Sequence, residues 1–386
     1  MHGDKKQLSW MDAFENYPHP PGISEEQAHK NTFVVDNALL EFWNLGRNQI
    51  QLWAEDGFDM LLLVVPHYRL EEFATEEHLI EEVLMGSKLT TAERLEQAAN
   101  IFKVDVKRIK LPFKPGEGLS RELISALVQR FGISLVKDRA VALFDIAGFS
   151  LLSPLEQVTQ LNSLSYSVNS AHNKLMERSI NIHFSRSTTG DGFYIWNRER
   201  DSMANIALFD LLQLILADNL IARRKAKGKT VPALKTCFHV GSHYEYHQAI
   251  GLNPSTFSYI VGNVSIELAR MIEKCQPGQI LIGDFKTPMT VSDQGEKEMM
   301  DTVSFINRVQ KEEVQLRNVI LSEEKIDSVN CYLTGSADDE HQTIKKYRIT
   351  DKHNLSRSVY NVKVDISLAN SDMLPLGLPP SKLSAF

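Results

Sequence analysis

Two short segments of the chain each place a carboxylate beside a glycine at the expected end of a strand. Residues 144–150 read FDIAGFS and contain Asp145, and residues 187–193 read STTGDGF and contain Asp191. Carboxylates are the hard oxygen ligands that Mg²⁺ prefers, and glycine allows the backbone to approach a phosphate closely. The simpler interpretation is a hairpin turn at Asp191 and a loop cap at Asp145. Together, the two segments predict a site for two divalent metal ions that hold a triphosphate.

The elements around these segments alternate between strands and helices. We expect long helices at 155–177 and 201–224, a further helix at 264–274, and strands at 141–144, 182–184, 193–196, 236–240 and 279–283. One hairpin lies between two of the helices. This order indicates an α+β fold, in which an antiparallel-rich, ferredoxin-like sheet carries its helices on one face.

Composition divides the 386 residues into four segments. Residues 1–22 end in a proline-rich run and predict a flexible lead-in. Residues 23–135 predict a mainly helical N-terminal region, because apolar positions recur at spacings of three and four. Residues 136–361 form the α+β domain, and residues 362–386 contain three prolines and predict a loosely docked C-terminal tail.

Charge and cysteine usage exclude several classes of protein. The formal net charge is −7, so no global basic field is present to hold nucleic acid or an anionic membrane. Asp210 and Asp218 interrupt the apolar stretch 206–221, which argues against a membrane span, and the N-terminus lacks the apolar core of a secretory signal. The three cysteines form no CxxC pair, which argues against a disulfide framework. We therefore expect a cytoplasmic protein.

The two acidic segments resemble the catalytic domain of class III nucleotidyl cyclases, the adenylate and guanylate cyclases. FDIAGFS is similar to the end of that family's first strand, and the Gly-Asp turn is similar to its later hairpin. The resemblance spans residues 138–353 and continues in FHVG at 238–241, VG at 261–262, ARM at 269–271 and CQPGQILI at 275–282. It implies conversion of a nucleoside triphosphate to its 3′,5′-cyclic monophosphate and pyrophosphate.

The resemblance also implies roles for particular residues. Asp145 and Asp191 would bind two Mg²⁺ or Mn²⁺ ions, and Ile146 would lend a backbone carbonyl. Arg270 matches the arginine of the transition state, and Lys352 lies near the position of a phosphate-binding lysine. The phosphates would be cradled by the amides of Ala147, Gly148, Phe149 and Ser150. The family's domains pair head to tail, so a homodimer with two composite active sites is implied.

Two positions that select the base depart from the family's purine pattern. Ser187 stands where the family has Lys or Glu, and Tyr259 stands where it has Asp or Cys. A hydroxyl and a bulky phenol suit a smaller base, as in the pyrimidine cyclases of bacterial anti-phage (Pycsar) systems, which this pocket resembles. We expect conversion of UTP to cyclic UMP, with CTP and ATP as alternatives; neutral drift or an alignment slip in an adenylate cyclase stays open. A cyclic-nucleotide-gated effector would read the product.

A further departure concerns the ribose. Ile266 stands where the family has an asparagine that positions the sugar, and Asn263 or Glu267 are candidates to replace it. This departure motivates an alternative, a non-catalytic cyclase-like module that binds a nucleotide or a partner. Retention of both aspartates favours the enzyme, because a pure binding module has no need to hold two metal ions.

Overall fold

The computed structural model describes most of the chain in two compact units. The first unit contains residues 17–136 and 244–260, and the second contains residues 137–243 and 261–383. The described ranges are 17–72, 81, 83–180, 182–199, 202–250, 253–290, 296–321, 323–335, 344–351, 354–370 and 372–383.

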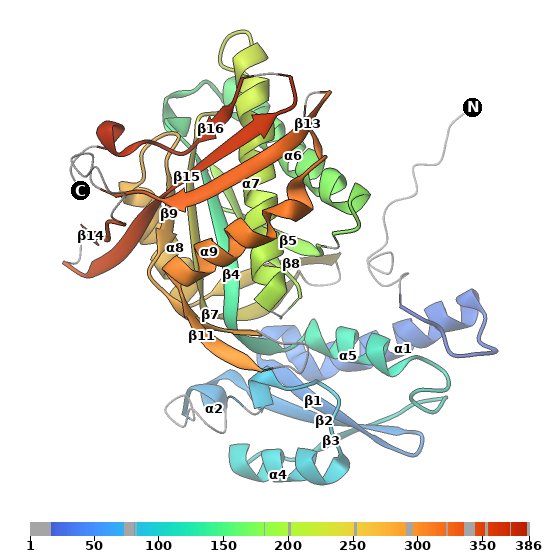
Figure 1. Ribbon diagram of the computed structural model, residues 1–386. Coiled ribbons are helices and arrows are strands. Elements are labelled where there is room, and N and C mark those ends of the chain that lie inside the picture. The colour runs from blue at the N-terminus through green and yellow to red at the C-terminus, as the bar shows by residue number, and fades with distance from the viewer. Residues whose placement is uncertain are drawn as a thin grey trace, which may run out of the picture. The chain divides into compact units, whose positions relative to one another are not determined.

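The first unit contains a three-stranded antiparallel sheet with helices on both faces (Figure 1). Its strands are β1 (Asn48–Asp56), β2 (Asp59–Pro66) and β3 (Lys107–Lys110). Residues of α1 and α5 pack with Met60, Leu62 and Val64 on one face, and residues of α4 pack with Leu61 and Leu63 on the other. The helices are α1 (Glu25–Trp43), α2 (His67–Glu72), α4 (Ala92–Phe102) and α5 (Arg121–Gln129).

This sheet differs from the mainly helical region expected for residues 23–135. The hairpin of β1 and β2 is covered on both faces, so Met60 to Val65 are all buried and the polar alternation of a half-exposed strand is absent. A short continuous apolar run does not distinguish a buried strand from a helix. The first unit is therefore itself a mixture of sheet and helix.

The second unit begins with a ferredoxin-like arrangement. In chain order it contains β4 (Ile133–Ile146, from Lys137 on), α6 (Pro154–Glu177), β5 (Phe184–Thr188), β6 (Gly192–Asn197), α7 (Ser202–Lys225) and β7 (Leu234–Ile250, as far as His243). Their order across the sheet is β7-β4-β6-β5, which is that of a βαββαβ unit. The antiparallel-rich α+β fold expected from the sequence is confirmed.

The remaining elements extend this sheet on the far side of β7. β9 (Ile280–Gly283) pairs parallel to β7, and β15 (Ser356–Leu368) pairs antiparallel to β9. The sheet continues through β13 and β12, while β10 and β11 form a separate hairpin. The other elements of this unit are α8 (Asn263–Lys274), β10 (Lys286–Thr290), β11 (Lys297–Asp301), α9 (Thr302–Glu312), β12 (Ile320–Leu321), β13 (Glu324–Leu333), β14 (Tyr347–Thr350) and β16 (Leu374–Leu376). β8 (Asn253–Val261) pairs with β7 and belongs to the first unit as far as Ile260.

Helices α6, α7 and α9 cover one face of the sheet of this unit (Figure 1). Ala140, Ala142 and Phe144 of β4 point into the core that these helices form. Because side chains alternate along a strand, Asp145 points to the opposite face, on which the Tyr194 hydroxyl of β6 donates to the backbone of α8 at Ser265. The sheet thus separates a helix-covered core from the face that carries the acidic residue.

Helix α7 is long and apolar enough, by length and composition, to cross a membrane. Most of its apolar side chains are instead buried in the core of the second unit. Asp218, one of the acidic residues that interrupt it, pairs with Lys174 of α6 at 3.1 Å. The apolar character of α7 is that of a core helix.

Strands β15 and β16, in the last described part of the chain, belong to the sheet. β15 runs through Val362 to Leu368, and β16 pairs antiparallel with its residues Val364 to Ile366. The side-chain amide of Asn361 donates to the carbonyl of Leu378 at 2.9 Å. The segment expected to be a loosely docked tail therefore contains, in its described part, two paired strands.

Candidate active site

Asp145 is the next-to-last residue of β4, at the point where this central strand lies beside the β5–β6 hairpin. It is paired in register with Gly192 of β6. A Cβ atom at position 192 would lie 1.8 Å from the carbonyl oxygen of Phe144, so only glycine fits there. This close approach places the residue before Gly192 next to Asp145.

That residue is Asp191, in the turn between β5 (Phe184–Thr188) and β6. The Ile146 amide donates to the Asp191 carbonyl at 3.0 Å and fixes the backbone of the turn to the end of β4. The Thr189 hydroxyl donates to Oδ1 of Asp191 at 3.1 Å and orients its carboxylate. The two aspartates of the predicted metal site are thus brought together by one strand pairing.

The two carboxylates form what we call the acidic pair, with one lysine beside it. Burial raises the pKa of Asp145, and the like charge of Asp191 raises this pKa further. Lys235, near the start of β7, opposes both effects with Nζ at 3.2 Å from Oδ2 of Asp145. The side chain of Asp145 is only 16% exposed, so water screens the repulsion poorly. The net effect is a site that favours more positive charge than Lys235 supplies.

The residues present fit a divalent cation that shares its coordination with a substrate. Within the part of the chain that the structure describes, no three or more His, Cys, Asp or Glu side chains come together to form a metal site. A cation at the acidic pair would therefore need further ligands from water and substrate. Mg²⁺ typically keeps water and is bound by one or two carboxylates together with substrate phosphates. Two adjacent carboxylates at a strand end, with the backbone of Ile146 beside them, match that mode of binding.

The loop after Ile146 holds the residues expected to cradle phosphates. Gly148 adopts a left-handed backbone with φ 70° and begins a short 3-10 turn, Phe149–Leu151. The Ala147 amide donates to the Ala233 carbonyl at 2.9 Å, so this amide is engaged within the fold. Of the four expected donors, the amides of Gly148, Phe149 and Ser150 carry the phosphate proposal.

Arg270 lies in a second group of charges, which we call the α8 ion cluster. It contains Arg270 and two glutamates of α8, together with Asp351 and Arg357 from the β14–β15 hairpin. Arg357 lies 2.8 Å from Oδ2 of Asp351, and Arg270 lies 3.6 Å from the same oxygen. The glutamates are Glu273, 3.2 Å from Arg270, and Glu267, 2.7 Å from Arg357.

The remaining predicted residues fall in different places. Asn263 is exposed at the first turn of α8, two turns before Arg270, and Ile266 is 50% exposed between them. Ser187 is half-buried on β5, paired with Tyr194. Tyr259 of β8 stacks on Tyr246 of β7 at 5.4 Å within the first unit. Lys352 lies outside the described residues.

Four residues of these clusters were not predicted from the sequence, namely Lys235, Glu273, Asp351 and Arg357. Lys235 is the second residue of β7, which neighbours β4, and the only signal in the sequence was a lysine just before a predicted strand. Asp351 directly precedes the predicted Lys352, and Arg357 lies further along in β15. The two residues meet α8 only in the folded chain, through Arg270 and Glu267. A buried carboxylate between two arginines has no signature in sequence spacing.

Comparison with known proteins gives structures but no sequence family. No family model matches the chain, and no curated protein matches it. One similar solved structure is the adenylyl cyclase CyaB from P. aeruginosa, with 15% identity, a TM-score of 0.35, and coverage of 62% of this chain and 97% of that chain. Another is the guanylate cyclase domain of RhGC from Catenaria anguillulae in complex with GTP, with 15% identity, a TM-score of 0.32, and coverage of 43% of this chain and 94% of that chain. Because the TM-scores are this low, the fold described above rests on the sheet order of this chain alone.

Proposed function

We propose that the protein is a metal-dependent nucleotidyl cyclase that converts a nucleoside triphosphate to its 3′,5′-cyclic monophosphate and pyrophosphate. The observation that carries this proposal is the acidic pair, in which two carboxylates meet at the end of β4 with incomplete neutralisation. Two adjacent carboxylates that served only the fold would cost stability. A site that binds divalent cations together with a triphosphate needs such carboxylates as ligands.

The residues of the site divide the work. Asp145, Asp191 and the Ile146 carbonyl would hold two Mg²⁺ or Mn²⁺ ions, which when bound lower the pKa of the attacking 3′-hydroxyl and offset charge on the leaving pyrophosphate. The amides of Gly148, Phe149 and Ser150 would hold phosphate oxygens. Lys235 would orient Asp145 and add positive charge near the phosphates.

The other half of the site would come from a second copy of the chain. In this proposal the protein is a homodimer, and Arg270 and Lys352 of one subunit contact the substrate held by the acidic pair of the other. Asn263 would position the ribose in place of the missing asparagine, since it is exposed and lies two turns from Arg270 on α8.

The preferred substrate in this proposal is UTP, with CTP next and ATP third. Ser187 offers a neutral hydroxyl in place of a charged side chain that would read a purine edge. Tyr259 stacks on Tyr246, and in this proposal its ring fills volume that the second ring of a purine would need. The enzyme would act in the cytoplasm and supply cyclic UMP as a second messenger in anti-phage defence, read by a cyclic-nucleotide-gated effector.

One observation favours a second candidate, a non-catalytic module that binds a nucleotide. The side chain of Arg270 is 22% exposed and already lies within ion-pair distance of Asp351 and Glu273. An arginine that stabilises a transition state must leave such partners or contact substrate in addition to them. The module would bind a nucleoside triphosphate at the acidic pair and release no pyrophosphate.

The two candidates are separated by one experiment. The full chain is incubated with Mn²⁺ and each of ATP, GTP, CTP and UTP, and the products are separated by chromatography and identified by mass. Cyclic UMP and pyrophosphate from UTP are expected. Cyclic AMP would keep the cyclase and reject the base preference, whereas saturable, Mn²⁺-dependent binding of a triphosphate without any product would favour the module.

A further inference from the structure

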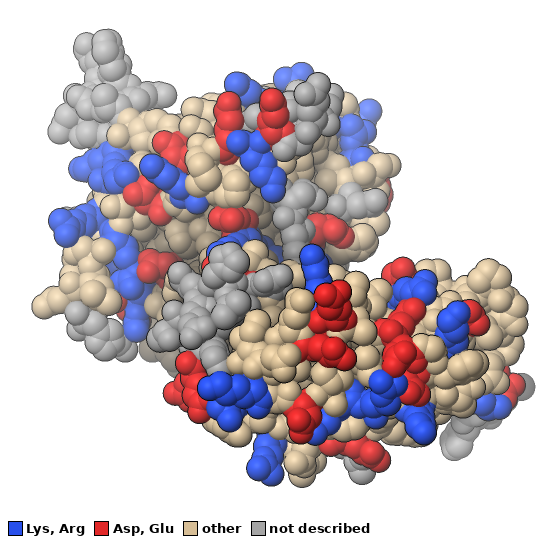
Figure 2. Space-filling view, turned by 90° about the horizontal axis from the view of Figure 1, so that it is seen from below, with Lys and Arg blue, Asp and Glu red and all other residues tan. Residues whose placement is uncertain are grey.

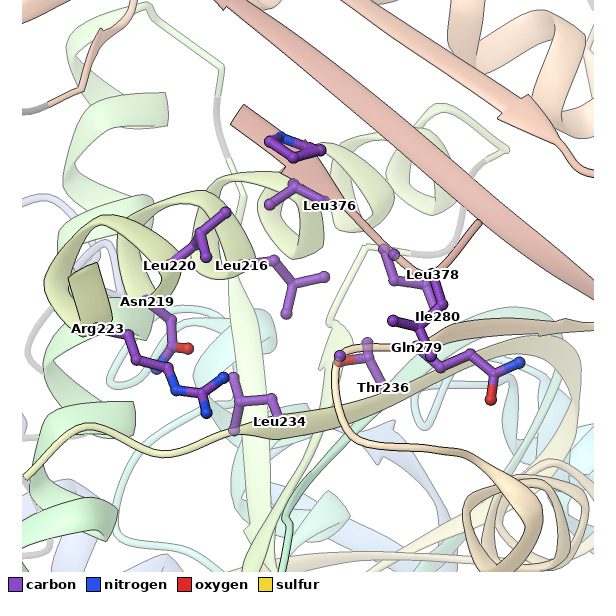
Figure 3. A pocket seen from close by; sticks show the side chains of 13 residues that line it. Leu216, Asn219, Leu220, Arg223, Leu234, Thr236, Gln279, Ile280, Leu376 and Leu378 are labelled. Atoms are coloured by element: carbon purple, nitrogen blue, oxygen red, sulfur yellow. The ribbon is translucent and has the colours of Figure 1, made fainter. Parts of the chain in front are cut away.

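A cavity of about 190 Å³ lies in the second unit, between α7, strands β7 and β9, and the residues after β15 (Figure 3). It is on the helix-covered face of the sheet, opposite the face to which Asp145 points. Helix α7 supplies one wall with Leu216, Asn219, Leu220 and Arg223, which share one helix face at spacings of three and four. Leu234 and Thr236 of β7 and Ile280 of β9 supply the floor. Residues after β15 close the remaining side, with Leu376 and Leu378 in contact with the space.

The wall at the end of the chain is held in place by specific contacts. β16 pairs with β15, and Asn361 donates to the carbonyl of Leu378 at 2.9 Å. Gly377 has φ 78°, and a Cβ atom there would lie 2.3 Å from the carbonyl oxygen of Val362. The chain therefore crosses β15 as closely as backbone allows, and the cavity is preformed, as ligand pockets usually are.

The lining is aliphatic with a small set of polar groups. Asn219 is 5% exposed and Thr236 is 1% exposed, and among the described residues neither Nδ2 of Asn219 nor Oγ1 of Thr236 has a hydrogen-bond partner. Buried polar atoms almost always have a partner, so two such atoms at one cavity are unusual. A ligand with a hydrogen-bonding atom and an aliphatic body would satisfy both features of the lining.

The charge at the cavity indicates the sign of that ligand. Arg223 is exposed, so it marks the mouth, and among the described residues no carboxylate forms an ion pair with it. A guanidinium binds a carboxylate with two parallel hydrogen bonds, which gives both energy and orientation. At ordinary packing density the space holds about ten non-hydrogen atoms. We propose that this cavity binds a small organic carboxylate with an aliphatic body, held by Arg223 at the mouth and by the leucines inside.

The position of the cavity makes it independent of the acidic pair as a binding site. Leu234 and Thr236 point into the cavity, and Lys235 between them points to the other face, where it pairs with Asp145. No residue of the acidic pair lines the cavity. Binding here can therefore be measured whether or not the chain is a cyclase.

The test uses hexanoate as the probe on the full chain, with hexan-1-ol as its uncharged analogue, and follows binding by titration calorimetry. We expect saturable binding of hexanoate with one site per chain, weakened about tenfold by Arg223→Gln through loss of the charge-assisted pair. Binding of hexan-1-ol should be equal in both proteins. Asp191→Asn should bind hexanoate as the unchanged protein does.

The matched control is Arg224→Gln, which removes the same charge from the neighbouring exposed position that does not line the cavity. Hexanoate binding should be unchanged in this variant. Two results would overturn the proposal: no saturable binding of hexanoate by the unchanged protein, or equal weakening in the two arginine variants, which would indicate only a general effect of net charge.

Discussion

The acidic pair and the α8 ion cluster lie in the same unit and are built in opposite ways. In the acidic pair two carboxylates face each other, and burial and their mutual repulsion raise the pKa of Asp145 despite Lys235. In the α8 ion cluster charges of opposite sign alternate from Glu267 through Arg357 and Asp351 to Arg270. Both groups sum to a formal charge of −1, so the difference lies in their arrangement. Every carboxylate of the α8 ion cluster lies beside an arginine, whereas the two carboxylates of the acidic pair adjoin each other, with Lys235 beside Asp145.

This difference is the one expected between the proposed metal site and a structural element. Unfavourable electrostatics persists in a fold where the surrounding structure holds it in place, and it is typical of functional sites. The α8 ion cluster instead joins a helix to a hairpin distant in sequence. On the side of the molecule drawn in Figure 2, acidic and basic side chains are interspersed.

The largest expected effect comes from Asp191→Asn. This isosteric change keeps the hydrogen bond from Thr189 and removes one charge, so cyclase activity should fall about a thousandfold through loss of metal binding. The free energy of unfolding should rise by about 1 kcal/mol, since the repulsion with Asp145 is removed. Product formation and urea unfolding measure the two effects.

The control for this variant is Asp218→Asn, which breaks the 3.1 Å pair with Lys174 elsewhere in the unit. It should leave activity unchanged and lower stability slightly. Normal turnover in Asp191→Asn would show that the acidic pair holds no catalytic metal.

The next effect is on the α8 ion cluster and has the opposite sign for stability. Asp351→Asn should lower the free energy of unfolding by about 3 kcal/mol, because the side chain is 2% exposed and two arginines would lose their shared carboxylate. Adding Arg357→Gln should recover part of this loss, since the two residues are in contact. Purely additive losses in urea unfolding would contradict the shared role of Asp351.

Arg270→Gln tests whether this arginine serves the substrate or the cluster. If it contacts the substrate, activity should fall about a hundredfold. Because its side chain is 22% exposed, its contact with Asp351 is long at 3.6 Å and its partner Glu273 is exposed, stability should change by less than about 1 kcal/mol. Arg357→Gln is the matched comparison and should lose stability more than activity. The reverse order would place Arg270 in the structure and support the binding module.

A smaller effect is expected on the choice of base. Ser187→Lys combined with Tyr259→Asp should shift the ratio of activities on UTP and ATP about tenfold toward ATP, because the pair restores charged groups that can read a purine edge. The ratio is measured with equal concentrations of the two nucleotides. An unchanged ratio would show that the base is recognised by other residues.

Much of the fold of the second unit could be predicted because its strands and helices show the hydrophobic patterns of half-buried elements. The contact between Asp145 and Asp191 was predicted for a related reason, since both lie in local motifs. Lys235 was not predicted, because its role depends on which strand neighbours β4. Asp351 and Arg357 depend on the packing of a hairpin against α8, which leaves no periodic signal. The engaged amide of Ala147 depends on a loop far away in sequence.

The smallest effect is a pH dependence that identifies the acidic pair by its sign. The pKa of Asp145 in the folded protein is raised above its ordinary value of 3.8, so the folded state holds this proton at a higher pH than the unfolded state does. The ionised residue therefore costs stability at neutral pH, and the cost disappears as the pH falls toward 3.8. Asp145→Asn should be more stable than the unchanged protein at pH 7.5, by about 1 kcal/mol or less because the pair with Lys235 is lost as well. This gain should shrink toward pH 5.

His239 also titrates in this range. Burial lowers its pKa to about 4, so it makes folding less favourable as the pH falls below 6.5, but it does so in both proteins and cancels in the difference. A gain that grows on acidification would mean that Asp145 is stabilised in its ionised form, and the acidic pair would then be as well balanced as the α8 ion cluster.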